Sequence, residues 1–181
     1  MPTSLNRQDK CISHRAETRK CRKRLAPYCQ GMGLDCGYGG EAIVPWAICL
    51  DLEEPYTCVG RDPQHLWGQS LSNLPFRDDT LDFIFSSHLI EDFDYNEQRH
   101  IIREWVRVIK VGGHIVTYAP IEEVYRQHCD DTGQPYNKAH QNDNFCAATF
   151  AALSLPAHLL EIVHDAEYPE EYSFEVVARK V

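Results

Sequence analysis

Short runs of hydrophobic residues alternate with polar segments along this chain, and their lengths predict strands separated by helices. Four runs in the first half are short enough for buried strands, at residues 32–36, 46–50, 65–68 and 81–86. Three more strands are expected at residues 114–119, 158–164 and 172–180. Strands that alternate with helices predict an α/β fold: a Rossmann-like, mostly parallel sheet with helices on both faces.

The pattern of caps and turns predicts the remaining elements. Asp94 and Glu97 have the spacing of a capping box, and hydrophobic residues at helical spacing follow until Gly112 and Gly113. Residues 121–142 are predicted to be an irregular polar loop, and a further helix is expected over residues 143–153. About seven residues join the last two strands, which is too few for a crossover. These strands should therefore pair antiparallel and add an antiparallel C-terminal strand to the sheet.

The first 30 residues differ from the rest in charge. They hold 8 Lys and Arg against 2 acidic residues, a local charge of +6, whereas residues 31–181 sum to −15 within a net charge of −9. We therefore predict a basic N-terminal helical extension over residues 1–30, with its helix over residues 7–25, and one domain over residues 31–181. The basic helix could stay solvated, dock on the acidic body or bind an anionic partner such as RNA. Nucleic-acid binding is not expected elsewhere, because an acidic surface repels phosphates.

Composition limits the remaining classes of protein. No stretch approaches the roughly 18 hydrophobic residues of a membrane span, and no signal-peptide pattern opens the chain, so we expect no membrane association. Several of the 8 cysteines lie in hydrophobic runs, where a free thiol behaves as a small buried side chain. The sequence thus predicts a reduced, cytoplasmic protein. Cys11, His14, Cys21 and Cys29 match no standard zinc spacing, so no metal is expected.

The segment that carries candidate chemistry is Asp35-Cys36-Gly37-Tyr38-Gly39-Gly40, directly after a predicted strand. Glycines at a strand end allow a tight turn and a close approach of the backbone to a ligand. Asp51 ends the next strand, where a carboxylate can accept hydrogen bonds from both hydroxyls of a ribose. Together these residues indicate a ligand that contains a nucleoside.

Two cofactor classes fit this arrangement. Residues 37–42 match the dinucleotide fingerprint G-x-G-x-x-G/A in form. However, residues 41–45 are too few for the long helix that would bind a pyrophosphate. Asp51 also follows Gly37 by 14 residues rather than the roughly 20 expected of that fingerprint. A nicotinamide-dependent oxidoreductase therefore stays open as the weaker alternative.

The glycine segment resembles the first motif of class I S-adenosylmethionine-dependent methyltransferases, and two further segments continue the resemblance. Residues 74–93 read LPFRDDTLDFIFSSHLIEDF and residues 103–114 read REWVRVIKVGGH. They are similar to the small-methyltransferase pattern LPF-D-x-FD-x-I-x-S-x-H-x-L-E-H followed by E-x-x-R-V-L-K-P-G-G. The resemblance spans residues 31–120 and implies the class I methyltransferase fold, with S-adenosylmethionine as cofactor.

The resemblance also implies roles for single residues. It places Asp35, Gly37 and Gly39 against the methionine part of the cofactor, and Asp51 on the ribose. The adenine would lie against Leu52, with Ser70 and Leu71 at its edge, and the methyl group would face Ser86, Ser87 and His88. A general base is required only for an acceptor that carries a proton, and the candidates are His88 and His140.

The acceptor is expected to be a small molecule or another soluble compound, because the motifs that grip DNA bases are missing. The loop over residues 121–142 is the predicted acceptor side, and the basic N-terminal helix could close over the cofactor. Three departures from the family pattern support a rival hypothesis, a catalytically weak or inactive methyltransferase-like scaffold. Gln69 stands where the family often has Asp, the first helix is nearly absent, and the chain is short and has no substrate domain.

Overall fold

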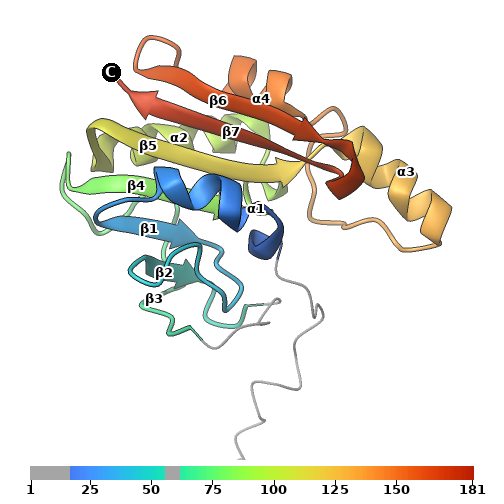
Figure 1. Cartoon of the computed structure of the whole chain (residues 1–181), viewed down its shortest axis with the longest axis horizontal. Coiled ribbons are helices and arrows are strands. Elements are labelled where there is room, and N and C mark those ends of the chain that lie inside the picture. The colour runs from blue at the N-terminus through green and yellow to red at the C-terminus, as the bar shows by residue number, and fades with distance from the viewer. Residues whose placement is uncertain (1–16, 56–61) are drawn as a thin grey trace, which may run out of the picture.

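A computed structural model of the chain describes residues 17–55 and 62–181, and a seven-stranded sheet runs through this part (Figure 1). The strand order is β3-β2-β1-β4-β5-β7-β6. The strands β3, β2, β1, β4 and β5 pair in parallel, whereas β7 is antiparallel to both β5 and β6. The predicted Rossmann-like sheet with an antiparallel C-terminal strand is confirmed. The strands are β1 (Gly33–Cys36), β2 (Ile48–Asp51), β3 (Leu66–Trp67), β4 (Leu81–Ser87), β5 (Ile109–Pro120), β6 (Leu160–Tyr168) and β7 (Ser173–Lys180).

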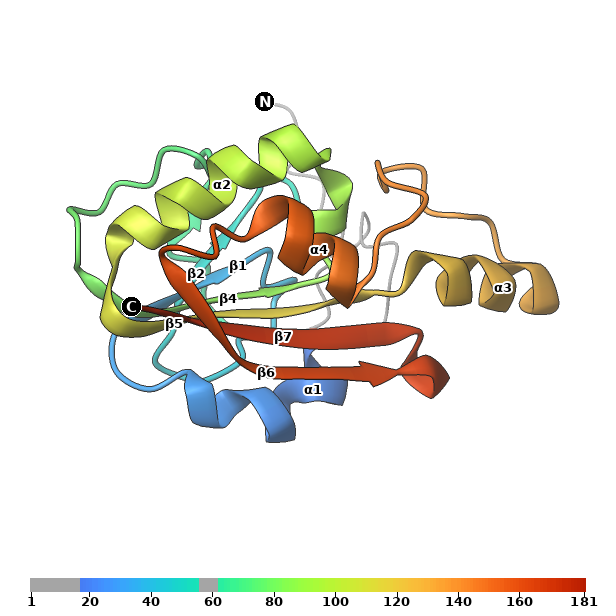
Figure 2. The same cartoon turned by 90° about the horizontal axis from the view of Figure 1, so that it is seen from above.

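Helices cover both faces of the sheet (Figure 2). The helices α2 (Tyr95–Val108) and α4 (Ala147–Ser154) pack on one face and α1 (Thr18–Leu25) on the other. Alternate residues of a strand point to opposite faces. Accordingly, Ile84 of β4 packs in the hydrophobic cluster under α2, while Phe83 and Phe85 pack with Cys21 and Leu25 of α1. Short 3-10 turns at Ala26–Tyr28, Ile90–Asp92 and Pro169–Glu171 complete the elements.

The helix α2 begins where the capping box predicts. The Asp94 side chain accepts hydrogen bonds from the backbone N–H groups of Asn96 and Glu97, and the Glu97 carboxylate accepts one from the backbone of Asp94. These bonds satisfy N–H groups that a helix start otherwise leaves unpaired. The side of the helix that faces the sheet buries Ile102 and Trp105 completely, so burial of hydrophobic surface and capping favour the same helix.

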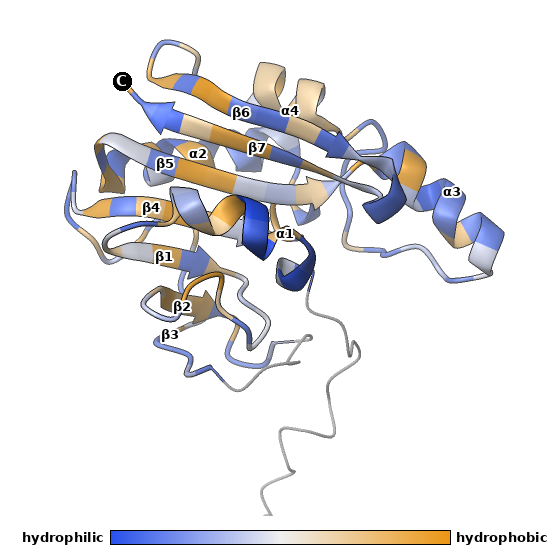
Figure 3. Ribbon diagram, viewed as in Figure 1, coloured by the Kyte–Doolittle hydropathy of each residue, from blue (hydrophilic) through white to orange (hydrophobic). Residues whose placement is uncertain are grey.

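The prediction of an irregular loop over residues 121–142 is wrong in its first half, because Glu122–Thr132 forms helix α3. This helix is mostly hydrophilic (Figure 3) and extends beyond the end of the sheet (Figure 1). Side-chain pairs four residues apart bind it together, including Glu122 with Arg126 and Gln127 with Asp131. Gly133 ends it in the left-handed conformation, at φ 69°. Hydrophobic periodicity missed α3 because few of its residues are buried.

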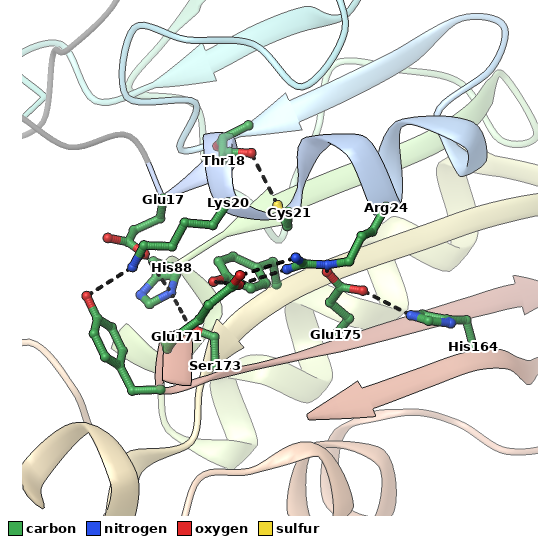
Figure 4. Close-up of polar contacts among 12 residues, drawn as sticks. Glu17, Thr18, Lys20, Cys21, Arg24, His88, His164, Glu171, Ser173 and Glu175 are labelled. Atoms are coloured by element: carbon green, nitrogen blue, oxygen red, sulfur yellow. Dashed lines mark hydrogen bonds and ion pairs between the residues drawn. The ribbon is translucent and has the colours of Figure 1, made fainter. Parts of the chain in front are cut away.

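The described end of the basic segment docks on the acidic body. Figure 4 shows Arg24 of α1 pointing at two carboxylates. Arg24 donates to Glu175 in β7 at 2.5 Å and to Glu171, in the 3-10 turn before β7, at 2.8 Å. On the other side of α1, Arg22 bonds Glu41 at 2.8 Å. Of the three alternatives for the basic segment, docking on the acidic body therefore applies to residues 18–25. Residues 1–16 of the predicted extension lie outside the described residues. Because Glu175 is fully buried, its ion pair with Arg24 lies partly out of water.

Two further predictions concern membranes and cysteines. No helix in the described ranges is long and hydrophobic enough to cross a membrane. Six cysteines are described, all as free thiols, and burial raises the pKa values of Cys21 and Cys29. No cluster of metal-ligating side chains occurs in the part of the chain that the structure describes. Cys11 and His14, the other members of the zinc alternative, lie outside that part.

Candidate functional site

A cavity of about 770 Å³ opens at the carboxyl ends of β1, β2 and β4. In an open α/β sheet this edge is where ligands bind, at the point where the strand order reverses, and here that point is β1 between β2 and β4. The volume suits a ligand of nucleoside size. Eight residues predicted from the sequence line the cavity: Gly37, Gly39, Asp51, Leu52, Ser70, Leu71, Ser87 and His88.

The glycine loop forms the wall nearest β1. Gly37 and Gly39 adopt left-handed conformations, at φ 67° and 59°, which favour glycine over other residues. The N–H of Gly37 donates to the carbonyl of Leu50 at 2.8 Å, which ties the loop to β2. A Cβ atom at Gly37 would lie 3.2 Å from the side chain of Leu89, so a side chain there would add a tight contact to the strain of the left-handed backbone.

Asp51 connects the glycine loop to the cavity. Its Oδ2 accepts from the N–H of Gly39 at 3.0 Å and its Oδ1 accepts from the N–H of Leu52 at 2.8 Å. Each carboxylate oxygen has a second lone pair, so two acceptor positions remain for a ligand. Burial raises the pKa of Asp51, although the two backbone N–H groups oppose that shift. The geometry fits recognition of two neighbouring hydroxyl groups.

Asp35, a predicted cofactor residue, does not line the cavity. It is fully buried in β1, where its Oδ2 accepts from the N–H of Ile43 at 2.7 Å and its other oxygen has no partner among the described residues. Burial raises the pKa of Asp35 to about 8. Through its hydrogen bond to Ile43, the side chain holds the segment that follows the glycine loop in place. No helix follows the loop there, as the short spacing predicts.

The end of β4 carries the next group of predicted residues. Ser87 lines the cavity and is buried, and its hydroxyl has no hydrogen-bond partner among the described residues. Ser86 points away from the cavity, because successive strand residues face opposite sides. His88 lines the cavity in a left-handed conformation, at φ 47°, and burial lowers its pKa to about 4. An imidazole with so low a pKa is neutral at physiological pH.

His140, the second predicted base, lies behind the cavity rather than in its wall. Its Nδ1 is 2.7 Å from Oε2 of Glu122, and the ring stacks near Tyr125 at 4.9 Å between centroids. None of the residues 121–142, the predicted acceptor side, lines the cavity. The helix at residues 122–132 instead extends past the end of the sheet (Figure 1), and the chain returns only behind the cavity, where the N–H of Gln141 donates to the carbonyl of Glu91 at 3.0 Å.

Several lining residues were missed by the sequence analysis. Glu97, His100 and Ile101 of α2 reach the cavity, and their spacing of three and four residues is the signal that places them on one helix face. Glu17 and Thr18 reach it from the start of α1 (Figure 4 shows both), which no sequence pattern indicates. The remaining ones are Tyr38, Leu50, Gly68, Gln69, Ser72, Leu89, Asp92 and Phe93.

The charges in the lining have one sign. Four carboxyl groups line the cavity, from Glu17, Asp51, Asp92 and Glu97, and no Lys or Arg of the described residues does. Such a surface attracts cations and repels anions at short range. Gln69, which stands where the resembling family often has Asp, donates from its amide to the carbonyl of Asn73 at 2.8 Å and so holds the loop in place.

One comparison finds a match to a known domain. A family model described as a methyltransferase domain matches residues 34–117, which contain β2, β3, β4, α2 and most of β1 and β5. This part of the chain is similar to a methyltransferase domain, and the sheet has the class I methyltransferase fold. No curated protein is similar enough in sequence to match.

Solved structures share the methyltransferase fold at low sequence identity. A methyltransferase from Thermotoga maritima, described as a possible histamine N-methyltransferase, has a TM-score of 0.70 at 15% identity, covering 93% of this chain and 91% of that chain. The N-methyltransferase NodS from Bradyrhizobium japonicum, solved with S-adenosylhomocysteine, has a TM-score of 0.60 at 16% identity, covering 90% and 86%. A Haloferax volcanii structure of a methyltransferase with its Trm112 activator gives 0.64 at 15%, covering 96% and 90%. At these identities the likeness concerns the fold alone.

Proposed function

We propose that this methyltransferase transfers the methyl group of S-adenosylmethionine to a small, soluble acceptor in the cavity at the carboxyl ends of β1, β2 and β4. The observation that carries the proposal is the convergence of three distant segments on one cavity: the glycine loop at Gly37, the carboxylate of Asp51, and the β4 end at Ser87 and His88. The free thiols of the described cysteines support a reducing compartment, such as the cytoplasm.

The cofactor positions follow from the groups that remain available in the cavity. Asp51 would accept hydrogen bonds from the ribose hydroxyls with its two unused lone pairs. Leu52 and Leu71 offer hydrophobic surface for the adenine, with Ser70 at its edge. The backbone at Gly37 and Gly39 would approach the methionine part, with Gly37 bonded to the carbonyl of Leu50, while Asp35 holds the following segment through the N–H of Ile43.

The bound cofactor supplies an activated methyl group on a positively charged sulfur. The protein then has to align an acceptor atom in line with that methyl group and keep water out. Ser87 and His88 stand at the end of β4, where the family faces the methyl group, and the unpartnered hydroxyl of Ser87 is available to a ligand. Because no Lys or Arg of the described residues lines the cavity, an acceptor that is neutral or a nitrogen base fits better than a phosphate or carboxylate.

Calorimetric titration with S-adenosylhomocysteine tests the proposal, with NADH as the competing ligand. We expect one site per chain for S-adenosylhomocysteine and none for NADH. Binding of NADH alone would favour the oxidoreductase alternative. A dissociation constant of about 1 mM corresponds to a binding free energy of only about 4 kcal/mol. If the folded protein binds neither ligand at roughly millimolar concentration, the scaffold alternative replaces the methyltransferase proposal.

A further inference from the structure

A buried polar cluster lies directly behind the cavity, at the end of β4. It consists of His88, Glu91 from the 3-10 turn Ile90–Asp92, Glu122 from α3, and His140. The side chains of Glu91, Glu122 and His140 are each at most 5% exposed. Burying several ionisable groups is costly unless their protons and charges are shared. The hydrogen-bond partners of the two imidazoles determine where these protons are.

The surroundings of His88 fix the hydrogen on its Nε2. The Ser173 hydroxyl donates to the carbonyl of Glu171 at 2.8 Å, so its oxygen can only accept from His88 Nε2, which lies 3.2 Å away (Figure 4). The carboxylate of Glu17, 3.6 Å from the same nitrogen, is also an acceptor. Nε2 of His88 therefore carries a hydrogen, and Nδ1 of the neutral ring presents a lone pair.

In its neutral form, His140 presents a lone pair toward the same point. Its Nδ1 donates to Oε2 of Glu122 at 2.7 Å. Burial would raise the pKa of Glu122, but the hydrogen bonds from His140 and Arg126 outweigh burial and lower it, so Glu122 is an ionised acceptor. With its hydrogen on Nδ1, a neutral His140 has its free lone pair on Nε2.

Glu91 lies between these two lone pairs. Its Oε1 is 3.6 Å from Nδ1 of His88 and 3.9 Å from Nε2 of His140, and its Oε2 has no partner among the described residues. If Glu91 were ionised, it could only accept hydrogen bonds. Three acceptors, the Glu91 carboxylate and the two imidazole lone pairs, would then meet in a buried space with no hydrogen to share between them. Burial and the nearby carboxylate of Asp92 raise the pKa of Glu91 well above the ordinary range, which agrees with a proton on this carboxyl group.

We propose that Glu91 is a positioning residue that holds a proton against Nδ1 of His88, so that the ring keeps its hydrogen on Nε2, between Ser173 Oγ and the Glu17 carboxylate, and Glu17 rather than His88 is the proton acceptor of the cavity. The proposal rests on the proposed methyl transfer. When the acceptor's X–H atom forms its bond to the methyl carbon, the carbon–sulfur bond breaks, sulfur keeps the electron pair, and the proton moves to the Glu17 carboxylate. The distances of 3.6 and 3.9 Å exceed those of formed hydrogen bonds and should shorten with ligand bound.

Other groups around His88 bear on this assignment. Lys20 of α1 pairs with Glu17 at 2.6 Å, and its positive charge disfavours an imidazolium at His88. The rings of Tyr118 and Tyr172 pack at 5.3 and 6.3 Å from that of His88, and neither brings a charge to it. Of the surrounding groups only Glu17 raises the pKa of His88, and burial, Lys20 and His140 all lower it.

Nitrogen NMR of protein labelled in its histidines tests the proposal on the full chain. The His88 signals are assigned by their loss in His88→Asn, since asparagine tolerates a left-handed backbone. We expect the neutral ring with hydrogen on Nε2 at neutral pH, and a shift of Nδ1 as Glu91 loses its proton at a pH above the ordinary range of carboxylic acids. This second titration step should disappear in Glu91→Gln.

Asp92→Asn is the matched control, because the Asp92 charge raises the pKa of Glu91. In this variant the step should persist and move to lower pH. A hydrogen on Nδ1 of His88, an imidazolium on His140 beside an ionised Glu91, or a step that survives Glu91→Gln overturns the proposal. The wild-type spectra and Asp92→Asn decide the matter if Glu91→Gln does not fold. If the titration step of His88 is observed but S-adenosylhomocysteine does not bind, only the methyltransferase proposal is overturned. If S-adenosylhomocysteine binds but the titration step is missing, only the proposal for Glu91 is overturned.

Discussion

The replacement Asp51→Asn should weaken the binding of S-adenosylhomocysteine strongly. In the wild type, each oxygen of Asp51 accepts one backbone hydrogen bond and keeps one lone pair for the ribose. An amide replaces one of these oxygens by an NH₂ group, so one ribose hydroxyl loses its acceptor. A hydrogen bond to a charged group contributes about 1.5–3 kcal/mol. We therefore expect the dissociation constant to rise roughly 10- to 150-fold.

Titration calorimetry measures this change, and Glu53→Gln is the matched control. Glu53 carries the same charge two residues away but does not line the cavity, so its loss should leave the affinity within about threefold. Asp51→Asn also leaves the N–H of Gly39 or Leu52 facing a donor, which should lower the melting temperature by several degrees. A folded Asp51→Asn protein whose affinity equals that of Glu53→Gln would refute the ribose assignment.

Three further changes test other parts of the account. Gly37→Val should abolish S-adenosylhomocysteine binding in calorimetry, because the new side chain would crowd the loop against Leu89. Gly112→Val is the control: it introduces the same left-handed strain, but no atom lies within 4 Å of the added Cβ, so binding should be retained. Equal affinities of the two variants would show that the ligand does not bind at the glycine loop. Arg24→Met should lower the free energy of unfolding in urea by roughly 3 kcal/mol, because the buried carboxylate of Glu175 loses its arginine and keeps only His164 as a partner. For exposed Arg19→Met we expect less than about 1 kcal/mol. Asp35→Asn should gain stability relative to the wild type as pH rises from about 5 to about 8. Burial raises the pKa of Asp35 to about 8, whereas the unfolded chain loses this proton near pH 4, so the wild-type fold loses stability over this pH range and the Asn variant does not. A stability difference between the two proteins that does not change with pH would contradict this.

The sheet and the cofactor side of the cavity were predictable because their signals are local. The β4 run and the capping box at Asp94 each lie within a few residues of the element that they specify. The glycine loop and Asp51 lie at strand ends, and parallel strands bring their carboxyl ends to one edge. Residues 35–51 therefore predicted this wall of the cavity without knowledge of the rest of the fold.

The acceptor side depended on contacts between distant segments, which a single sequence does not reveal. Glu17 reaches the cavity only because α1 docks on the sheet through Arg24 and carboxylates about 150 positions away. His140 was recognised as a candidate base, but its place beside Glu122 depends on α3, a polar helix without a clear hydrophobic face. Glu91 lay inside a recognised motif, yet its burial between two imidazoles becomes visible only in the folded chain.

A crystal structure of the protein with S-adenosylhomocysteine tests the central claim most directly. The account predicts the ligand in the cavity at the ends of β1, β2 and β4, with both ribose hydroxyls on the Asp51 carboxylate. The adenine should lie between Leu52 and Leu71, and the sulfur atom should lie nearest Ser87 and His88. A ligand bound outside this cavity, or bound with its adenine against His88, would contradict the account.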